Sequence, residues 1–168
     1  MAERIEIALT VNGAAVRTSV PARQHLSDFL RTTLGLTGSH LGCEHGVCGA
    51  CSVRLDGCVV RGCLILAAQA DGAVVETIEG VAESGEIDDL HDAFIARNAY
   101  QCGFCAPGML LTAAEVLAES AGGAGTAGGG LMTRDEIRAA LSGNLCRCTG
   151  YQAILDAVEA VMLSRAKA

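Results

Sequence analysis

The sequence predicts an α+β fold in which a strand-rich first half is followed by a helical second half. Apolar and polar residues alternate over residues 5–11, which is the period of a strand with one buried face. After residue 86 the apolar residues recur three and four positions apart, which is the period of an amphipathic helix. Residues 79–86 between the two halves are polar and contain glycine. We therefore expect two domains, residues 1–78 and 79–168, with this polar segment as the linker.

A hairpin and a short helix are expected first. The strand over residues 5–11 ends at Asn12-Gly13, a pair that favours a two-residue turn, and residues 16–20 form the return strand. A helix that ends at Gly35 follows from apolar residues at helical spacing. These residues are Leu26, Phe29, Leu30 and Leu34.

A second hairpin follows a loop that is rich in glycine and cysteine and ends at Cys51. Its expected strands are residues 51–55 and 58–62, and Asp56-Gly57 is its two-residue turn. A short apolar helix over residues 64–70 and a strand over residues 74–78 complete this half.

Four helices are expected in the second half. The first is marked by Leu90, Phe94 and Ile95. Pro107 begins the second, whose apolar stripe is Met109, Ala113, Val116 and Leu117. Thr133 and Glu136 form a capping-box pattern that opens the third. The stripe of the fourth is Ile154, Leu155, Val158, Val161 and Met162. Residues 121–130 contain only glycine, alanine and one threonine, which is typical of a surface loop.

Composition excludes several functions. A net charge of −7 argues against a nucleic-acid surface, whose affinity depends on clustered Lys and Arg. There is no Trp, with only two Tyr and three Phe, so a platform for stacking bases or sugars is not expected. No apolar run approaches the roughly 18–20 residues of a membrane span. The acidic, alternating N-terminus is unlike a signal peptide, so we expect a cytoplasmic protein.

The nine cysteines indicate metal binding. An odd number of cysteines cannot all pair, and disulfides are rare in a reducing compartment. Cys43, Cys48 and Cys51 have the C-x4-C-x2-C spacing that opens the cluster loop of plant-type [2Fe–2S] ferredoxins. Thiolates are soft ligands that suit iron and sulfur. The interleaved glycines let the backbone wrap closely around an anionic cluster.

Hairpin geometry selects the fourth ligand of this group. If Asp56-Gly57 is a two-residue turn, Leu55 pairs with Cys58 and Cys51 lies opposite Gly62. Cys63 then returns beside Cys51, whereas Cys58 lies roughly 16 Å away at the tip. We therefore predict that Cys63 is the ligand. A zinc site remains an alternative. His40 and His45 could serve a Rieske-type cluster, but four cysteines are available and we expect both histidines to face solvent.

A second group of cysteines precedes two of the expected helices. Cys102 and Cys105 stand just before Pro107, and Cys146 and Cys148 stand before the last helix. Helix N-termini favour bound anions, because their unpaired N–H groups point at the ligand. A redox-active C-x2-C dithiol is the alternative, but it leaves Cys146 and Cys148 without a role.

Three motifs in this order resemble one known family over nearly the whole chain: Cys43 to Cys51 followed by Cys63, Gln101 to Gly108, and Gly143 to Tyr151. It is the iron–sulfur (small) subunit of the molybdenum hydroxylases, which include xanthine dehydrogenase. The resemblance implies a ferredoxin-like β-grasp domain that holds one [2Fe–2S] cluster, followed by a four-helix domain that holds a second. The implied ligands are Cys43, Cys48, Cys51 and Cys63 for the first cluster, and Cys102, Cys105, Cys146 and Cys148 for the second. One departure is Ala106, which stands where a threonine is common.

The resemblance also implies partners and a reaction. In the family, the helical-domain cluster faces molybdopterin, present as its cytosine dinucleotide, and the ferredoxin-like cluster faces FAD. Gln101 and Cys148 match positions that approach the pterin. The implied assembly is a dimer of heterotrimers, with a large molybdopterin-binding subunit and a medium FAD-binding subunit. The implied reaction is hydroxylation of a carbon centre with oxygen from water, from which electrons leave singly through the two clusters.

No motif for substrate chemistry is evident in this chain, such as a dinucleotide-binding G-x-G-x-x-G, a phosphate loop or a nucleophile elbow. The sequence is therefore best interpreted as an electron-transfer subunit without a catalytic residue of its own. A zinc-stabilised interaction module and a free two-cluster ferredoxin are the alternatives.

Overall fold

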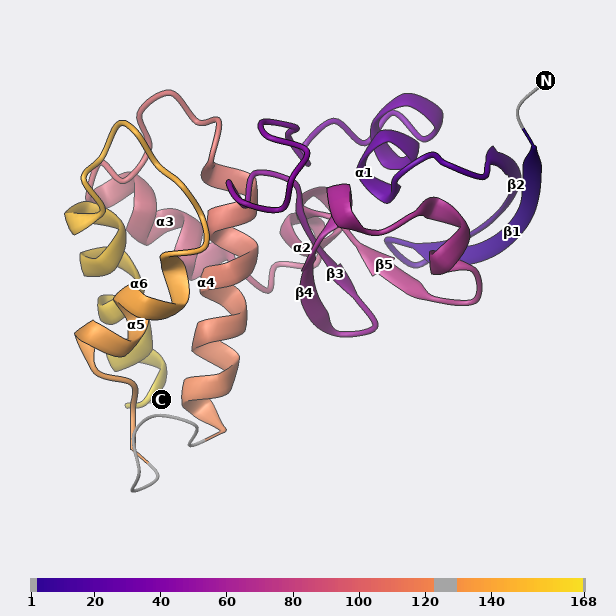
Figure 1. Cartoon of the computed structure of the whole chain (residues 1–168). Coiled ribbons are helices and arrows are strands. Elements are labelled where there is room, and N and C mark those ends of the chain that lie inside the picture. The colour runs from indigo at the N-terminus through magenta and orange to yellow at the C-terminus, as the bar shows by residue number, and fades with distance from the viewer. Residues whose placement is uncertain (1–2, 123–129, 168) are drawn as a thin grey trace.

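A computed structural model describes residues 3–122 and 130–167, which form a sheet domain and a helical domain packed side by side (Figure 1). Strands and short helical turns come first and long helices come last, so the predicted α+β class is confirmed. The start of β1 lies at the far end of the sheet domain, and α6, the last helix, lies in the helical domain (Figure 1). The expected loop over residues 121–130 falls mostly on residues 123–129, which lie outside the described part.

The first domain is a mixed sheet of five strands in the order β2-β1-β5-β3-β4. Strands β1 and β5 are parallel, and the other neighbours are antiparallel. The strand bounds are Arg4–Val11 for β1, Ala14–Pro21 for β2, Ser52–Leu55 for β3, Cys58–Arg61 for β4 and Val74–Glu76 for β5. Both predicted hairpins are present, and β5 is two residues shorter than expected. The buried face of the sheet packs on a short helical segment around Phe29, which is fully buried.

That helical segment differs from a regular helix. It begins as a single α-turn, α1 (Leu26–Asp28), and continues as a π-helical turn over Phe29–Thr33. The backbone N–H of Leu34 donates to the carbonyl of Phe29 at 3.3 Å, five residues back. Gly35 follows with φ +72°, which is the expected end of the helix.

The prediction of one helix over residues 64–70 is wrong. Two 3-10 turns, Gly62–Leu64 and Ala67–Ala70, flank an extended backbone at Ile65 and Leu66. The extended pair bridges to the start of α1, because Leu26 donates to the carbonyl of Ile65 at 2.7 Å. Tertiary pairing therefore overrides the apolar pattern at this point.

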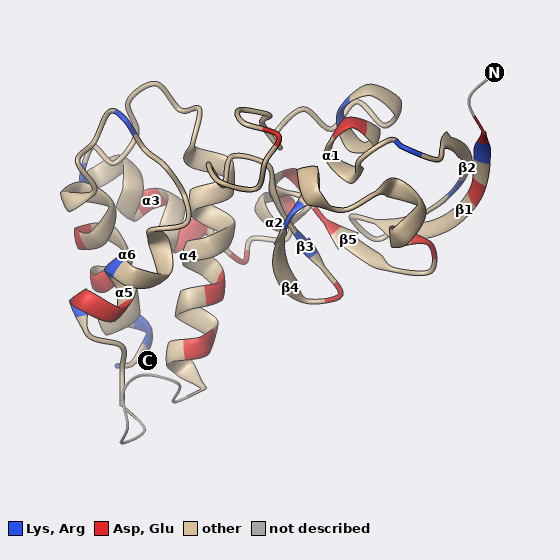
Figure 2. Cartoon of the chain, viewed as in Figure 1, with Lys and Arg blue, Asp and Glu red and all other residues tan. Residues whose placement is uncertain are grey.

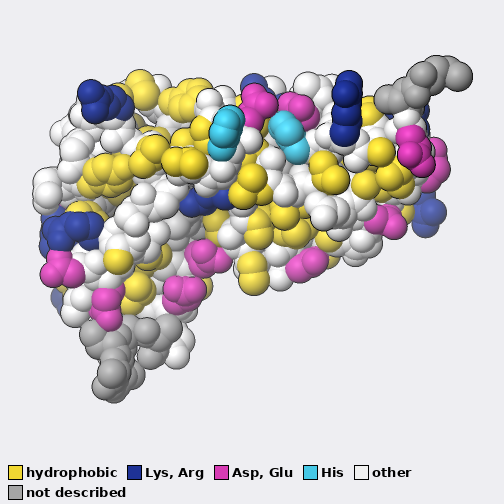
Figure 3. Space-filling model, in the orientation of Figure 1, with side chains coloured by type: hydrophobic (Ala, Val, Ile, Leu, Met, Phe, Trp, Pro, Cys, Tyr) yellow, Lys and Arg dark blue, Asp and Glu magenta, His cyan; other side chains and the backbone are white. Residues whose placement is uncertain are grey.

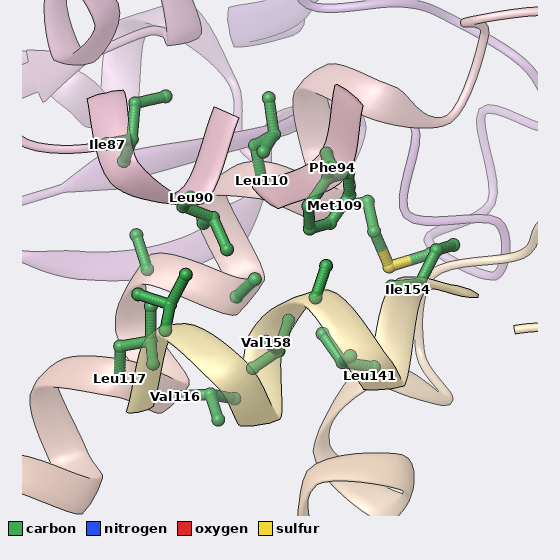
Figure 4. Close-up of a cluster of buried hydrophobic side chains, with 14 of the residues drawn as sticks. Ile87, Leu90, Phe94, Met109, Leu110, Val116, Leu117, Leu141, Ile154 and Val158 are labelled. Atoms are coloured by element: carbon green, nitrogen blue, oxygen red, sulfur yellow. The ribbon is translucent and has the colours of Figure 1, made fainter. Parts of the chain in front are cut away.

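The second domain contains α2 (Ile78–Glu83), α3 (Asp88–Ala96), α4 (Ala106–Ala121), α5 (Arg134–Leu141) and α6 (Gln152–Arg165). The four expected helices correspond to α3 to α6. Their apolar stripes form one buried core, part of which is drawn in Figure 4. Ile95 is the exception to the predicted stripes, since it is 56% exposed. The predicted capping box is confirmed: the Thr133 hydroxyl accepts from the Glu136 N–H, and the Glu136 carboxylate accepts from the Thr133 N–H.

The prediction of a linker over residues 79–86 is wrong, because most of these residues belong to α2. Val81 is 1% exposed and belongs to the helical core. Gly80 does not act as a flexible joint; it allows α2 to approach Asn12 closely. A Cβ at Gly80 would lie 2.4 Å from the Asn12 amide oxygen. Asn12 in turn holds the start of α2, since its amide oxygen accepts from the Thr77 N–H at 2.8 Å.

The two domains are joined by polar contacts as well as by this helix. Strands β3 and β4 pack against α4, and the Glu115 carboxylate of α4 accepts from the Val59 N–H of β4 at 2.7 Å. Arg54 of β3 donates to Glu86 at 2.7 and 3.0 Å and to Glu76 at 3.2 Å. Charged residues of both signs are otherwise spread along the chain, and Lys and Arg occur singly rather than in one cluster (Figure 2).

We expect Glu86→Gln to lower the free energy of unfolding by at most about 1 kcal/mol at pH 7, because the Glu86 side chain is 42% exposed. The hydrogen bond from Arg54 holds the pKa of Glu86 below its usual value. A lowered pKa stabilises the fold above the unfolded-state pKa of about 4.3, and this contribution is lost as the pH falls through the folded-state pKa.

The difference between Glu86→Gln and the parent protein should therefore vanish in acid. Urea unfolding at pH 7 and at about pH 3 measures it, and Glu83→Gln, at an exposed position of α2, is the control. A difference that stays constant between the two pH values would contradict the assignment to Arg54.

Candidate iron–sulfur centres

The first candidate centre is built on the loop before β3. Cys43, Cys48 and Cys51 lie on it, and Cys51 is buried. Gly46 and Gly49 have φ +76° and +74°, a backbone conformation that glycine adopts without steric cost. The loop is also tight, since a Cβ at Gly46 would lie 2.4 Å from a methyl carbon of Leu64. Gly46 and Gly49 therefore provide the backbone conformation and the close approach that the prediction requires of them.

The hairpin returns the fourth cysteine to this loop. Leu55 pairs with Cys58, as expected, and the Gly62 N–H donates to the Cys51 carbonyl at 3.1 Å. Cys63 follows in the 3-10 turn after β4 and is 8% exposed. Its thiol lies close enough to interact with those of Cys51 and Cys43. Cys58 is exposed at the other end of the hairpin.

Backbone N–H groups point at the sulfur of Cys43. Those of His45 and Cys48 donate to it at 3.4 and 3.3 Å, and they lower the pKa of Cys43 to about 6. Burial raises the pKa of Cys63 to about 11, and the neighbouring Cys51 thiol adds to the shift. The loop thus stabilises a thiolate at Cys43. Burial of Cys63, in contrast, disfavours a thiolate there unless a bound cation balances its negative charge.

The second candidate centre lies where two loops lead into helices. Cys102 and Cys105 precede α4, and Cys146 and Cys148 precede α6. The Cys102 thiol interacts with that of Cys148, and the Cys105 thiol with that of Cys146. All four line one small cavity together with Ala99, Tyr100, Gln101, Gly103, Ala106 and Thr149. Burial raises the pKa of Cys105 to about 12, with the Cys146 thiol as the next cause.

Tyr151 holds the loop of the second pair. It has φ +68°, which is uncommon for a residue with a side chain. Its hydroxyl accepts from the Cys146 N–H at 2.9 Å and donates to the Asn144 carbonyl at 3.1 Å. The Thr149 hydroxyl lies 3.1 Å from the Cys146 sulfur. No pattern in the sequence indicated that these two side chains hold the loop.

The two groups of cysteines lie close together across the domain boundary. The Leu145 N–H, next to Cys146, donates to the Cys48 carbonyl at 2.8 Å. A Cβ at Gly108 of α4 would lie 2.3 Å from the Gly49 carbonyl oxygen, so the two backbones touch. This intimate contact between the loops was not predicted.

The two histidines of the first loop differ. His45 is exposed, as expected. The expectation for His40 is wrong, because its ring is half-buried and stacks on Phe104 of the helical domain at 5.0 Å between ring centroids. His40 Nδ1 lies 2.8 Å from the Phe104 carbonyl oxygen. His40 therefore contributes to the contact between the domains.

The surface around these loops is apolar in places. Val47, Leu64, Phe104 and Leu145 are between 47% and 63% exposed. Hydrophobic side chains, cysteines included, spread across both domains on the face shown in Figure 3, with charged side chains between them.

Buried polar atoms without partners support an anionic occupant of each group. In the part of the chain that the structure describes, four such atoms lack a hydrogen bond: Ser27 Oγ, Ser39 Oγ, Tyr100 Oη and Asn144 Nδ2. Leaving such an atom unpaired costs about 1–3 kcal/mol. Ser27 Oγ faces Gly62, since a Cβ there would lie 2.4 Å from it. Tyr100 lines the cavity of the second group. Ser27 Oγ and Tyr100 Oη are potential donors beside the first and the second group, which suits the acceptor sulfurs of a cluster.

The donor set of each group fits a [2Fe–2S] cluster, because the two irons of such a cluster share four cysteines.

Two family models match the chain. Residues 9–77 match the 2Fe-2S iron-sulfur cluster binding domain, and residues 77–159 match the [2Fe-2S] binding domain. No helix in the described part of the chain has the length and apolar character that a membrane crossing requires.

Curated relatives match over most of their length. The small subunit of nicotine 6-hydroxylase from Paenarthrobacter nicotinovorans is 47% identical over 156 residues, which cover 93% of this chain and 88% of the relative. The iron–sulfur-binding subunit of xanthine dehydrogenase from Escherichia coli O157:H7 is 40% identical over 156 residues, which cover 93% of each.

Two solved structures contain a region with the same fold as this chain. The structure of quinoline 2-oxidoreductase from Pseudomonas putida 86 contains a chain with a TM-score of 0.84 and 42% identity, over 98% of this chain and 96% of that one. The aldehyde oxidoreductase of Desulfovibrio gigas gives a TM-score of 0.82 and 41% identity over 98% of this chain, which corresponds to 18% of that longer polypeptide. The chain belongs to the family of small iron–sulfur subunits of the molybdenum hydroxylases, and it carries two [2Fe–2S]-binding domains.

Proposed function

We propose that this chain carries single electrons from a molybdopterin centre to FAD, both held by partner subunits, through two [2Fe–2S] clusters. The observation that carries the proposal is the grouping of eight cysteines into two sets of four, one in each matched domain. The ninth, Cys58, lies apart on the hairpin. We place the boundary between the two domains at residues 78 and 79.

We assign the ligands by these groups. Cys43, Cys48, Cys51 and Cys63 would hold the first cluster, and Cys102, Cys105, Cys146 and Cys148 the second. Close approach of the thiols supports the pairing of Cys63 with the first loop, and that of Cys102 with Cys148 and of Cys105 with Cys146. When bound, a [2Fe–2S] cluster supplies one-electron redox chemistry.

The chain's own groups set the conditions for that chemistry. The N–H groups of His45 and Cys48 stabilise negative charge at the Cys43 sulfur. The N-termini of α4 and α6 favour negative charge at the second group. Burial of Cys51 and Cys63 excludes water from one side of the first group. Hydrogen bonds, charge and solvent exposure are the factors by which a protein tunes the potential of a cluster.

We propose that the second group faces the molybdopterin cytosine dinucleotide of a large subunit, and the first group the FAD of a medium subunit. Gln101 and Cys148 would approach the pterin, and the exposure of both residues supports this. Ala106 presents no hydroxyl at the start of α4. We further propose a dimer of heterotrimers in the cytoplasm.

The proposal is tested by purifying the chain with its native partners and recording visible absorption, iron content and EPR spectra after reduction. Two distinct reduced-state EPR signals and co-purification with a large and a medium subunit are expected. A colourless, iron-free preparation that contains zinc would identify a zinc-stabilised module instead. Two clusters without those partners would identify a free two-cluster ferredoxin.

The substrate would be bound by the large subunit, so the intact complex is needed to find it. Relatives are named as acting on nicotine, caffeine and nicotinate, which are all nitrogen heterocycles. We therefore propose this substrate class, and a screen of nitrogen heterocycles, purines among them, against aldehydes on the complex tests it.

A further inference from the structure

Arg61 connects the two groups of cysteines. It is the last residue of β4, two positions before Cys63, and is half-buried. Nη2 of its guanidinium donates to the Gly143 carbonyl at 2.8 Å and to the Asn144 amide oxygen at 2.9 Å. Nη1 donates to the Ser52 hydroxyl. One side chain of the sheet domain is thus bonded both within its own domain and to the loop that carries Cys146.

The acceptors of Arg61 are themselves fixed beside the cysteines. Ser52 follows Cys51, and its hydroxyl donates to the Gly49 carbonyl at 2.7 Å. Asn144, two residues before Cys146, is 1% exposed, and its amide oxygen also accepts from the Thr112 hydroxyl at 3.3 Å. The contact is tight, because a Cβ at Gly143 would lie 2.8 Å from Arg61 Nη2. Arg61 therefore has one well-defined place between the loops.

The charge of Arg61 is not balanced by a carboxylate. Among the described residues, no Asp or Glu oxygen lies within 4.0 Å of its guanidinium, whereas Arg54, Arg134 and Arg165 each pair with an acid. The oxygens that accept from Arg61 are all neutral. A partly buried cation without an anion is unfavourable. Thiolate-bound clusters on both sides would supply the missing negative charge, and more of it when they are reduced.

We propose that Arg61 is a positioning residue that both clusters share. Its fork of hydrogen bonds holds the two cysteine loops in one arrangement, and its positive charge favours the reduced state of both clusters. The inference rests on the proposed function, because it requires a cluster at each group. Within residues 3–122 and 130–167, no other charged side chain donates hydrogen bonds both to Ser52, directly after the first cysteine loop, and to the loop that carries Cys146.

The test uses the intact complex with Arg61→Met, which removes charge and fork, and Arg61→Lys, which keeps the charge alone. Arg17→Met is the matched control, since Arg17 is exposed on β2 at the opposite edge of the sheet. The midpoint potential of each cluster is measured by redox titration followed by EPR. The magnetic interaction between the two reduced clusters is read from the same spectra.

We expect Arg61→Met to lower the ratio of reduced to oxidised cluster about tenfold at a fixed potential, which is a downward shift of about 59 mV for both clusters. Arg61→Lys should keep both potentials near those of the parent protein but change the magnetic interaction. If Arg61→Met does not assemble, Arg61→Lys still tests the fork.

Two outcomes would overturn the inference. The first is that the midpoint potentials of both clusters are the same in Arg61→Met as in Arg17→Met. The second is that Arg61→Lys leaves the magnetic interaction between the reduced clusters unchanged. Absence of two iron–sulfur signals from the parent complex would instead contradict the proposed function, so the two failures are distinguishable.

Discussion

Cys63→Ala is expected to remove one of the two clusters and about half of the iron, whereas Cys58→Ala should retain both. Cys63 is 8% exposed, and its thiol lies close enough to interact with those of Cys51 and Cys43. Cys58 is exposed at the far end of the same hairpin, away from the loop that carries the other three cysteines. Because a bound cluster stabilises the folded state, Cys63→Ala should also lower the thermal stability of the sheet domain.

The variants Cys63→Ala and Cys58→Ala are compared by the amounts of iron and sulfide per chain and by the EPR spectrum after reduction. The signal of the second centre should survive in Cys63→Ala, since its four cysteines lie in the helical domain. Equal loss of iron from the two variants would refute the ligand assignment. Loss of both signals from Cys63→Ala would show that the centres do not assemble independently.

The register of the second hairpin was predictable from the sequence because a two-residue turn leaves no freedom. Once Asp56-Gly57 is the turn, the pairing of Leu55 with Cys58 fixes every later pair, and the observed ladder agrees. The position of Cys63 beside Cys51 follows from the same geometry. Local turn chemistry thus brought together residues twelve positions apart in the sequence.

The segment over residues 79–86 was not predictable in the same way. Glycine and charge suggested a linker, yet Gly80 serves a contact with Asn12 that only the folded structure reveals. Val81 is the one large apolar residue in a polar segment, and it is buried because α2 packs against α4. A short helix contains too few residues for its apolar side chains to show the helical period in the sequence. Such a helix is stabilised by tertiary contacts instead.

The cysteine groups could be predicted, but the contact between them could not. Spacing identifies ligands because the chain must wrap around a cluster locally. Arg61, Asn144 and His40 act across the domain boundary instead, and their partners depend on how the domains pack. In the sequence, Arg61 is an ordinary basic residue at the end of a strand, and no period or spacing relates it to Asn144.

Gly108→Ala should have the second large effect, because Gly108 lies in the first turn of α4 against the other domain. In an ordinary helix, alanine is more favourable than glycine by about 1 kcal/mol. Here its Cβ would lie 2.3 Å from the carbonyl oxygen of Gly49 and 3.3 Å from the carbonyl carbon. Two backbones must separate to admit it, and such overpacking costs about 1–3 kcal/mol. The substitution is therefore expected to destabilise the chain rather than to stabilise it.

The displacement should also reach the first centre, because Gly49 follows Cys48 directly. We expect Gly108→Ala to lower the urea midpoint and to weaken the magnetic interaction between the reduced clusters. Gly122→Ala at the other end of α4 is the control: its φ is −75°, and the nearest atoms to a Cβ there are at 3.4 and 3.6 Å. If both alanines raised stability alike, the close approach of Gly108 and Gly49 would be wrong, and with it the packing of the two domains that brings the cysteine groups together.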